Sequence, residues 1–332
     1  MPSIRVLMQN RNRSVVNPQS YRIAEAKYER FVPDTRLPAL LFVFVLALTS
    51  PVTTTPSVAD ENVVTGASFF DGFERLGRHR WNISDGWSNG DHQSCRWRKR
   101  NIAIKDGILI FTLGLEPDVV SLTKRPEGEA DTVEKTQHDR DYSCAEIQTK
   151  QEFGYGTYET RMTSAPVPGT VSAMFTYIGP GLNPDKPHDE IDFEVLGKDT
   201  TKVQLNFFRH GKAENDKLVP FGYDNATTMS RMAFEWFPNA LRWYLDGKLV
   251  HEVKPTAEKP IPSEPSRIML SLWSGQGRNM EDWLSRFDPS TLPQQATYDY
   301  VAFTKMGEPC QFPESVVCRT NPAPKKPDTD KK

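Results

Sequence analysis

Residues 190–195 read Glu-Ile-Asp-Phe-Glu-Val, a strict alternation of acidic and apolar side chains. Successive residues of a β-strand point to opposite faces, so this period of two predicts a strand with one acidic and one apolar face. The acidic face would carry Glu190, Asp192 and Glu194, and the apolar face Ile191, Phe193 and Val195. Three carboxylates side by side repel each other, so a fold that keeps them together has a use for them. Hydrolysis of a glycosidic bond by paired carboxylates is one such use.

Short strand-like segments separated by turns fill residues 68–308. Two of them, at residues 102–111 and 241–253, contain Asp-Gly between apolar runs, which is the signature of a β-hairpin. Alternation also marks residues 155–162, 203–208, 268–273 and 297–303. The 26 Pro and 20 Gly favour turns, and no segment has a long apolar period of 3.6 residues. These features predict one domain with an all-β sandwich or barrel.

The first 59 residues differ from the rest and predict a leader with a signal peptide. Charged and polar residues precede an apolar run from Ala39 to Leu48, and residues 57–59 offer a small-x-small cleavage site. The run is shorter than the roughly 20 residues that a transmembrane helix needs. An N-terminal membrane anchor is the alternative. The signal peptide predicts a secreted or periplasmic protein with no stable membrane anchor.

We expect residues 60–318 to form the single domain. Residues 319–332, rich in Pro, Lys and Asp, are expected to be a disordered tail. Residues 116–142 are charged and lack periodicity, which predicts an exposed loop between strands. A net charge of −2 gives no reason to expect nucleic acid or an anionic membrane as a partner. We expect the protein to be a monomer.

The chain has four cysteines, which fits an exported protein. Cys95 and Cys144 flank two strand-like segments, whereas Cys310 and Cys318 are close together in sequence. We predict the pairs Cys95–Cys144 and Cys310–Cys318. Four cysteines allow three pairings, so the sequence alone leaves the choice open. A zinc site is a weak alternative, because the sequence has no Cys-x-x-Cys or His-x-x-x-His spacing.

The spacing of Glu190 and Glu194 sets a geometric condition for catalysis. A retaining glycosidase needs two carboxyl groups about 5–5.5 Å apart. Residues four apart on a flat strand have Cα atoms roughly 13 Å apart, so the two side chains can approach only on a concave, twisted sheet. Asp192 lies between them, and like charges at close range raise the pKa of at least one member, which helps to keep a general acid protonated. The alternative is an ordinary solvated strand face.

Aromatic residues are the second signal, because rings stack on the C–H faces of sugars. Among the seven Trp, three lie among Gly, Ser, Asn and Asp, which predicts loops at the rim of a cleft: Trp87, Trp273 and Trp283. Tyr177 ends a strand-like segment. Large aromatic side chains more often belong to a core. We assign to the core Trp81, Trp236 and Trp243.

Together these segments resemble glycoside hydrolase family 16. Residues 190–194 match its Glu-x-Asp-x-Glu signature. Other segments are similar to the bacterial lichenases, the endo-β-1,3-1,4-glucanases, at residues 86–90, 144–147, 153–159, 175–180 and 196–206. The resemblance covers residues 68–308. Residues 187–190 and 310–318 look closer still to one branch, the exported endo-glycanases with which bacteria trim their own acidic exopolysaccharide of the succinoglycan type.

The resemblance implies a β-jelly-roll of two antiparallel sheets with a substrate cleft on the concave face. By position in the signature, Glu190 would be the nucleophile, Glu194 the general acid/base and Asp192 the residue that tunes them. The positions that line the lichenase cleft correspond to Asn89, Glu146, Phe175, Tyr177, Asn206 and Trp273. In the family a disulfide joins the positions of Cys95 and Cys144. A structural calcium ion is also implied, with a carboxylate from Asp299 and a carbonyl from Gly107.

The chain departs from the lichenase pattern around these subsites. His188 stands where lichenases carry an aromatic residue, and two roles are open for it: contact with sugar, or support of its neighbours. Gln148 replaces an Arg. The other departures are Met174, Phe208 and Ser271. Cereal-type glucan is therefore not the only substrate to consider.

The sequence thus predicts a secreted retaining endo-β-glycanase that needs no cofactor for its chemistry. Its polysaccharide substrate would be 1,3-1,4-linked β-glucan or a related bacterial exopolysaccharide. Two alternatives use the same fold: a transglycosylase, and a non-hydrolytic β-glucan-binding protein. A pure binding protein gains nothing from three repelling acids, and product analysis with an added acceptor separates transglycosylation from hydrolysis.

Overall fold

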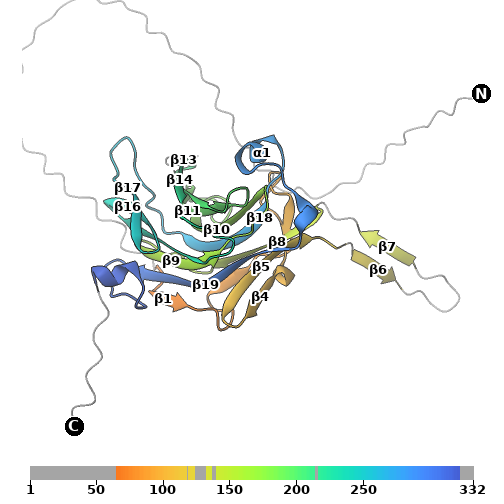
Figure 1. Ribbon diagram of the computed structural model, residues 1–332, viewed down its shortest axis with the longest axis horizontal. Helices are drawn as coiled ribbons and strands as arrows, with labels where there is room; N and C mark the ends of the chain where they lie inside the picture. Colours follow the sequence, from red (N-terminus) through yellow and green to blue (C-terminus); the bar gives the residue numbers. More distant parts are fainter. Residues whose placement is uncertain (1–64, 118, 124–131, 137–139, 214–215, 322–332) are drawn as a thin grey trace, which may run out of the picture. The chain divides into compact units, whose positions relative to one another are not determined.

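The computed structural model describes residues 65–117, 119–123, 132–136, 140–213 and 216–321. Antiparallel strands make up most of it and form two sheet layers, one lying over the other (Figure 1). The predicted leader and its apolar run lie outside the described residues. Within the described part of the chain, no helix is long and apolar enough to cross a membrane. The all-β sandwich predicted from the strand pattern is confirmed.

The inner sheet is curled, and the acidic side chains of one of its strands lie on its concave face. Its order is β2-β8-β18-β10-β11-β12, with β13 and β14 pairing on β12. The strands are β2 (Trp81–Ile83), β8 (Tyr142–Thr149), β18 (Arg267–Ser274), β10 (Thr170–Ile178), β11 (Asp189–Leu196), β12 (Lys202–Arg209), β13 (Lys212–Ala213) and β14 (Lys217–Pro220). Strand β11 therefore lies between β10 and β12, away from the sheet edges.

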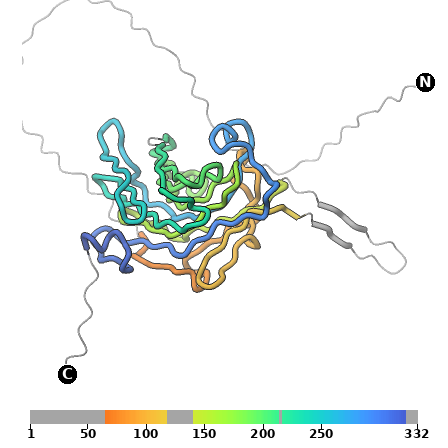
Figure 2. Tube along the Cα trace, viewed as in Figure 1, coloured from red at the N-terminus to blue at the C-terminus, as the bar shows by residue number. Residues whose placement is uncertain are grey.

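The outer sheet supports this layer from below, as the chain trace in Figure 2 also shows. Its order is β17-β16-β15-β9-β19, and both β5 and β1 pair with the far side of β19. The strands are β1 (Phe69–Asp71), β4 (Ile102–Lys105), β5 (Ile108–Leu115), β9 (Gly156–Thr163), β15 (Ser230–Phe237), β16 (Ala240–Leu245), β17 (Lys248–Val253) and β19 (Gln294–Lys305). Strand β3 (Cys95–Trp97) pairs in parallel with β8.

Both predicted hairpins are present, and their turns explain the Asp-Gly pairs. Asp106 and Gly107 join β4 to β5 with φ of 51° and 74°, and Asp246 and Gly247 join β16 to β17 with φ of 47° and 77°. Two-residue hairpin turns of this type need positive φ at both positions, which Gly adopts freely and Asp tolerates.

The core lies between the two sheets and contains the apolar face of β11. Ile191, Phe193 and Val195 are completely buried, as the alternation predicts. The three Trp assigned to the core, Trp81, Trp236 and Trp243, are buried as well. Each fully buried large apolar side chain contributes about 1.5–3 kcal/mol. Trp243 Nε1 also donates to the backbone oxygen of Asp192 at 3.3 Å, which ties the outer sheet to β11 beneath the acidic face.

Both predicted disulfides are present. Cys95 and Cys144, with Cα atoms 5.7 Å apart, join β3 to β8. Cys310 and Cys318, 5.1 Å apart, close the loop that ends in a 3-10 turn at Val316–Arg319. This loop lies on the outer sheet, because Ser315 Oγ and the Val316 amide donate to the buried carboxylate of Glu159 in β9.

Three local predictions were wrong. Residues 116–142 include two paired strands, β6 (Val119–Thr123) and β7 (Thr132–Thr136), where β-branched residues are frequent enough to favour a ladder. Trp273 lies in β18 rather than in a loop. Trp283 lies in helix α1 (Arg278–Leu284), whose two turns are too short for a clear helical period in the sequence.

Residues 319–321, which the sequence assigns to the tail, belong to the described structure. Arg319 ends the C-terminal 3-10 turn, and the Cys310 amide donates to the carbonyl of Asn321 at 3.0 Å. The disulfide loop thus holds residues 319–321 in place. Residues 322–332 lie outside the described residues.

Candidate active site

The register of the inner sheet arranges the acidic residues in rows across its concave face. Directly opposed residues of antiparallel strands point to the same face. Each acid therefore has one neighbour on β10 and one on β12: Glu190 lies between Tyr177 and Phe208, Asp192 between Phe175 and Asn206, and Glu194 between Ala173 and Gln204. The sheet continues the last row across β18 and β8, where Ala173 faces Ser271 and Ser271 faces Glu146.

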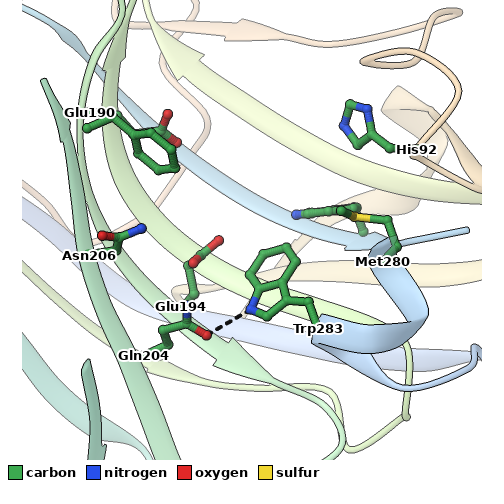
Figure 3. A pocket seen from close by; sticks show the side chains of 9 residues that line it. His92, Glu190, Glu194, Gln204, Asn206, Met280 and Trp283 are labelled. Atoms are coloured by element: carbon green, nitrogen blue, oxygen red, sulfur yellow. Dashed lines mark hydrogen bonds between the residues drawn. The ribbon is translucent and has the colours of Figure 1, made fainter. Parts of the chain in front are cut away.

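A cavity of about 440 Å³ opens over these rows (Figure 3). Glu190, Glu194, Gln204 and Asn206 line one side, and His92 and Met280 face them from the other. The complete lining is His92, Glu190, Glu194, Gln204, Asn206, Phe208, Trp273, Met280 and Trp283. Two carboxyl groups of one strand thus project into one space large enough for a sugar.

The environment of Glu194 and Asp192 favours their protonated forms. Burial raises the pKa of Glu194 to about 8, and the negative charges of Glu190 and Asp216 add to the shift. Burial likewise raises the pKa of Asp192 well above its usual range, with further contributions from the charges of Glu190 and Glu194 and a hydrogen bond with Glu190. Asp192 Oδ2 is buried without a hydrogen-bond partner in the described part of the chain, which is costly for a charged oxygen.

Glu146 is a third acid on the same face whose pKa is raised by burial. Its carboxylate accepts a hydrogen bond from Ser84 Oγ at 2.6 Å. Burial raises its pKa to about 7, and the Ser84 hydrogen bond offsets part of that shift. Glu146 does not line the cavity itself.

Helix α1 forms one wall of the cavity and is tied to the inner sheet. Trp283 Nε1 donates to Gln204 Oε1 at 2.8 Å, the bond drawn in Figure 3. Lys198 Nζ, from the turn after β11, donates to the carbonyl of Trp283. The rings of Trp273 and Trp283 lie 6.2 Å apart, and His92 meets Trp273 edge-on at 6.0 Å. Aromatic faces therefore lie beside the acidic rows, as sugar binding requires.

The structure brings some of the predicted binding residues into the cavity and leaves others outside. Asn206, Trp273 and Trp283 line it. Phe175 and Tyr177 share rows with the acids on β10 but are not part of the lining. Trp87 is 44% exposed in the loop before β3, and Asn89 in that loop accepts from Trp97 Nε1.

Sequence reasoning missed four lining residues as binding residues: His92, Gln204, Phe208 and Met280. Gln204, Asn206 and Phe208 are spaced two apart on β12 and share one face of the strand. The same period of two that located the acids therefore also pointed to Gln204 and Phe208. His92 and Met280 come from a loop and a short helix and carry no such signal. In the sequence, Phe208 stands out only as a departure from the lichenase pattern.

The calcium prediction concerns a different place, on the outer sheet. Asp299 lies in β19 next to Tyr298, which pairs with Leu109 two residues after Gly107. The carbonyl oxygen of Gly72 and Oε1 of Glu74 would lie 3.7 and 3.8 Å from a Cβ on Gly107, and oxygen atoms are the ligands that calcium prefers. Arg161 Nη1 already pairs with Asp299 Oδ2 at 3.0 Å, which leaves the other oxygen for an ion. The described residues contain no group of three or more His, Cys, Asp or Glu that could hold a metal.

The model of the family "Glycosyl hydrolases family 16" matches residues 89–302, which include the whole acidic strand. The chain belongs to glycosyl hydrolase family 16. As a family 16 member it is a glycoside hydrolase, an enzyme that acts on O-glycosyl bonds.

Named relatives of this family 16 chain are a bacterial glycanase and bacterial beta-glucanases. It is 42% identical over 254 residues to the endo-1,3-1,4-beta-glycanase ExoK of Rhizobium meliloti (strain 1021), covering 76% of this chain and 84% of that one. It is 38% identical over 247 residues to a beta-glucanase of Bacillus subtilis (strain 168), covering 74% and 90%. The solved beta-glucanase of Bacillus licheniformis superimposes with a TM-score of 0.60 at 36% identity, covering 73% of this chain and 99% of that one.

Proposed function

We propose that the protein is a secreted, retaining endo-β-glycanase that hydrolyses 1,3-1,4-linked β-glucan or a related bacterial exopolysaccharide. The observation that carries this proposal is the pair of carboxyl groups, Glu190 and Glu194, that one strand projects into one cavity. Burial raises the pKa of Glu194 to about 8, so this group holds a proton at neutral pH. A protonated carboxyl group beside a second carboxyl group in one cavity is what acid-assisted nucleophilic displacement requires.

In the first step, Glu194 donates its proton to the glycosidic oxygen while Glu190 attacks the anomeric carbon from the opposite face. The leaving sugar departs with that proton, and a glycosyl ester forms on Glu190. In the second step, Glu194 removes a proton from water, which attacks the anomeric carbon and releases Glu190. Two inversions give net retention. Asp192, held protonated by its burial, donates to Glu190 and limits the repulsion among the three acids of β11.

The substrate class rests on the relatives and on the cavity. The relatives named above are described as a 1,3-1,4-beta-glycanase and beta-glucanases. Trp273 and Trp283 give the cavity two aromatic rings for pyranose faces, and Gln204 and Asn206 supply amide groups for hydroxyls. Phe208 and His188 mark the end of the acidic row where this chain departs from the lichenase pattern, so we include acidic exopolysaccharide of the succinoglycan type among the substrates.

One screen tests this function. The protein is incubated with lichenan, laminarin, xyloglucan and an acidic bacterial exopolysaccharide. Products are sized by mass spectrometry, and their initial anomeric configuration is read by NMR. We expect internal cleavage of lichenan or of the exopolysaccharide, with β-configured products appearing first. Initial α-products, or binding without release of reducing ends, would contradict the proposal. Longer products formed with an added acceptor would indicate transglycosylation.

We also propose that the protein is exported after cleavage behind Ala59. Both disulfides support this, because disulfides persist in oxidising compartments. N-terminal sequencing of protein recovered outside the cytoplasm is expected to begin at Asp60. Recovery of material that still contains residues 39–48 would overturn the idea.

A structural calcium ion at Asp299 and Gly107 is a further proposal, with the carbonyl of Gly72 as a third donor. Removal of the ion by a chelator is expected to lower the melting temperature by a few degrees, because an ion that binds only the folded state stabilises it. Asp299→Asn keeps the size of the side chain and should melt at the lower temperature with or without chelator. An unchanged melting temperature of the unsubstituted protein would rule out the site.

A further inference from the structure

His188 contacts the proposed nucleophile directly. Its Nε2 lies 2.5 Å from Glu190 Oε2. His188 immediately precedes β11, two residues before Glu190, and a chain that runs extended into the strand places both side chains on the same face. Glu190 also faces the cavity, whereas His188 is not part of the cavity lining.

The imidazole ring is fixed by aromatic neighbours on both flanking strands. It stacks on Phe208 of β12 with ring centroids 5.0 Å apart and planes 14° apart. Tyr177 of β10 packs on it at 5.1 Å. The backbone oxygen of His188 accepts from the Gly211 amide at 2.8 Å, so the main chain is fixed as well. A ring held in this way has little freedom to turn toward a sugar.

We propose that His188 is a positioning residue for the nucleophile: Nε2–H donates to Glu190 Oε2 and holds the other carboxylate oxygen toward the anomeric carbon. This rests on the proposed role of Glu190. Of the two roles open from the sequence, the contacts favour support over sugar binding, since Nε2 is engaged by Glu190 and the ring packs against two aromatic residues. Pre-aligned reactants react faster, and a displacement of about 1 Å can cost about 10²-fold in rate.

The test separates the hydrogen bond from the packing. His188→Phe keeps a ring between Tyr177 and Phe208 but cannot donate. His188→Gln and His188→Met form a matched pair of similar length, in which only Gln carries a donor. Thermal melting of all three variants checks folding, and the Gln/Met pair decides the question if the Phe variant does not fold.

The main readout is the rate at which an activated 2-deoxy-2-fluoro-β-laminaribioside traps the nucleophile, with peptide mapping of the labelled residue. Loss of the donor in the Phe and Met variants is expected to slow trapping and lower kcat on lichenan by about 10–100-fold. KM should stay within about threefold. The Gln variant should recover most of the rate.

Different outcomes separate the proposed function, with Glu190 as the nucleophile, from the proposed positioning role of His188. If the unsubstituted enzyme is labelled on a residue other than Glu190, or is not labelled, the proposed function fails whatever the variants do. If Glu190 is labelled but the Phe and Met variants react at the unsubstituted rate, the positioning role is wrong. A raised KM with unchanged kcat would instead assign His188 to sugar binding. Equal losses in Gln and Met would assign it to packing alone.

Discussion

Glu190→Gln is expected to abolish hydrolysis of β-glucan, with kcat reduced on the order of 10⁴-fold or more, because the amide cannot form the glycosyl ester. Glu194→Gln should cost about 10²–10⁴-fold on lichenan, where the leaving sugar needs a proton. It should cost much less on an aryl glycoside whose leaving group departs without protonation. Both variants should keep the fold, since neither side chain contributes to the core between the sheets.

Alanine variants of the same two residues distinguish the two roles. Azide fits the space of a missing carboxylate and should restore turnover of an activated aryl glycoside in both variants, because that substrate needs no proton from Glu194. With Glu190→Ala it attacks the anomeric carbon directly and gives an α-glycosyl azide. With Glu194→Ala it intercepts the ester on Glu190 and gives a β-glycosyl azide, as NMR can show. Glu252→Gln, on β17 of the outer sheet, is the control and should leave activity unchanged. The reverse pair of azide products would exchange the assigned roles.

The same assignment fixes the direction of the pH dependence. The general acid works only when protonated, and the pKa of Glu194 is raised to about 8 mainly by burial. Activity on lichenan should therefore fall as the pH rises through about 8. Aryl glycosides with good leaving groups should escape this decline in the first step, because they need no proton from Glu194.

The fold was accessible from the sequence because local signals agreed with each other. The alternation in residues 190–195 fixed which side chains enter the core, and the structure buries Ile191, Phe193 and Val195 accordingly. The two Asp-Gly turns fixed two hairpins through the positive φ that they require. Short local patterns of this kind do not depend on which strands pair across the sheet.

What the sequence could not give depends on long-range packing. His92 and Met280 reach the cavity from a loop and a two-turn helix, and their place depends on how α1 joins β12 through Trp283 and Gln204. The contact between His188 and Glu190 needs the rings of β10 and β12 beside it. The high pKa of Glu146 comes from burial, which no local pattern of β8 reveals.

Glu146→Gln is expected to stabilise the protein at pH 8 by up to about 3 kcal/mol, taking about 1.36 kcal/mol per pKa unit. The folded-state pKa of Glu146 is about 7, above the usual 4.5. Between these values the folded protein holds a proton that the unfolded chain has lost, so stability falls as the pH rises from about 4.5 to 7. Gln does not titrate and its oxygen can still accept from Ser84. Denaturant unfolding measures this difference. The free energies of unfolding of the Glu146→Gln variant and the unsubstituted protein should differ at pH 8 and be almost equal at pH 4.5.

Ser84→Ala tests whether burial of the carboxylate is the cause. The Ser84 hydrogen bond lowers the pKa of Glu146, so its loss should raise that pKa further. With Glu146 retained, the Ser84→Ala variant should therefore lose more stability between pH 4.5 and 8 than the protein with Ser84. In the Glu146→Gln background the same change should cost a similar amount at both pH values. Asp192 and Glu194 also have raised pKa values, but they are present in every variant, so their titration cancels in each comparison. A Gln variant that is equally stabilised at pH 4.5 and 8 would show that packing, not ionisation, sets the difference. The expected outcome makes Glu146 a costly charge on the concave face, in the same row of the inner sheet as Glu194.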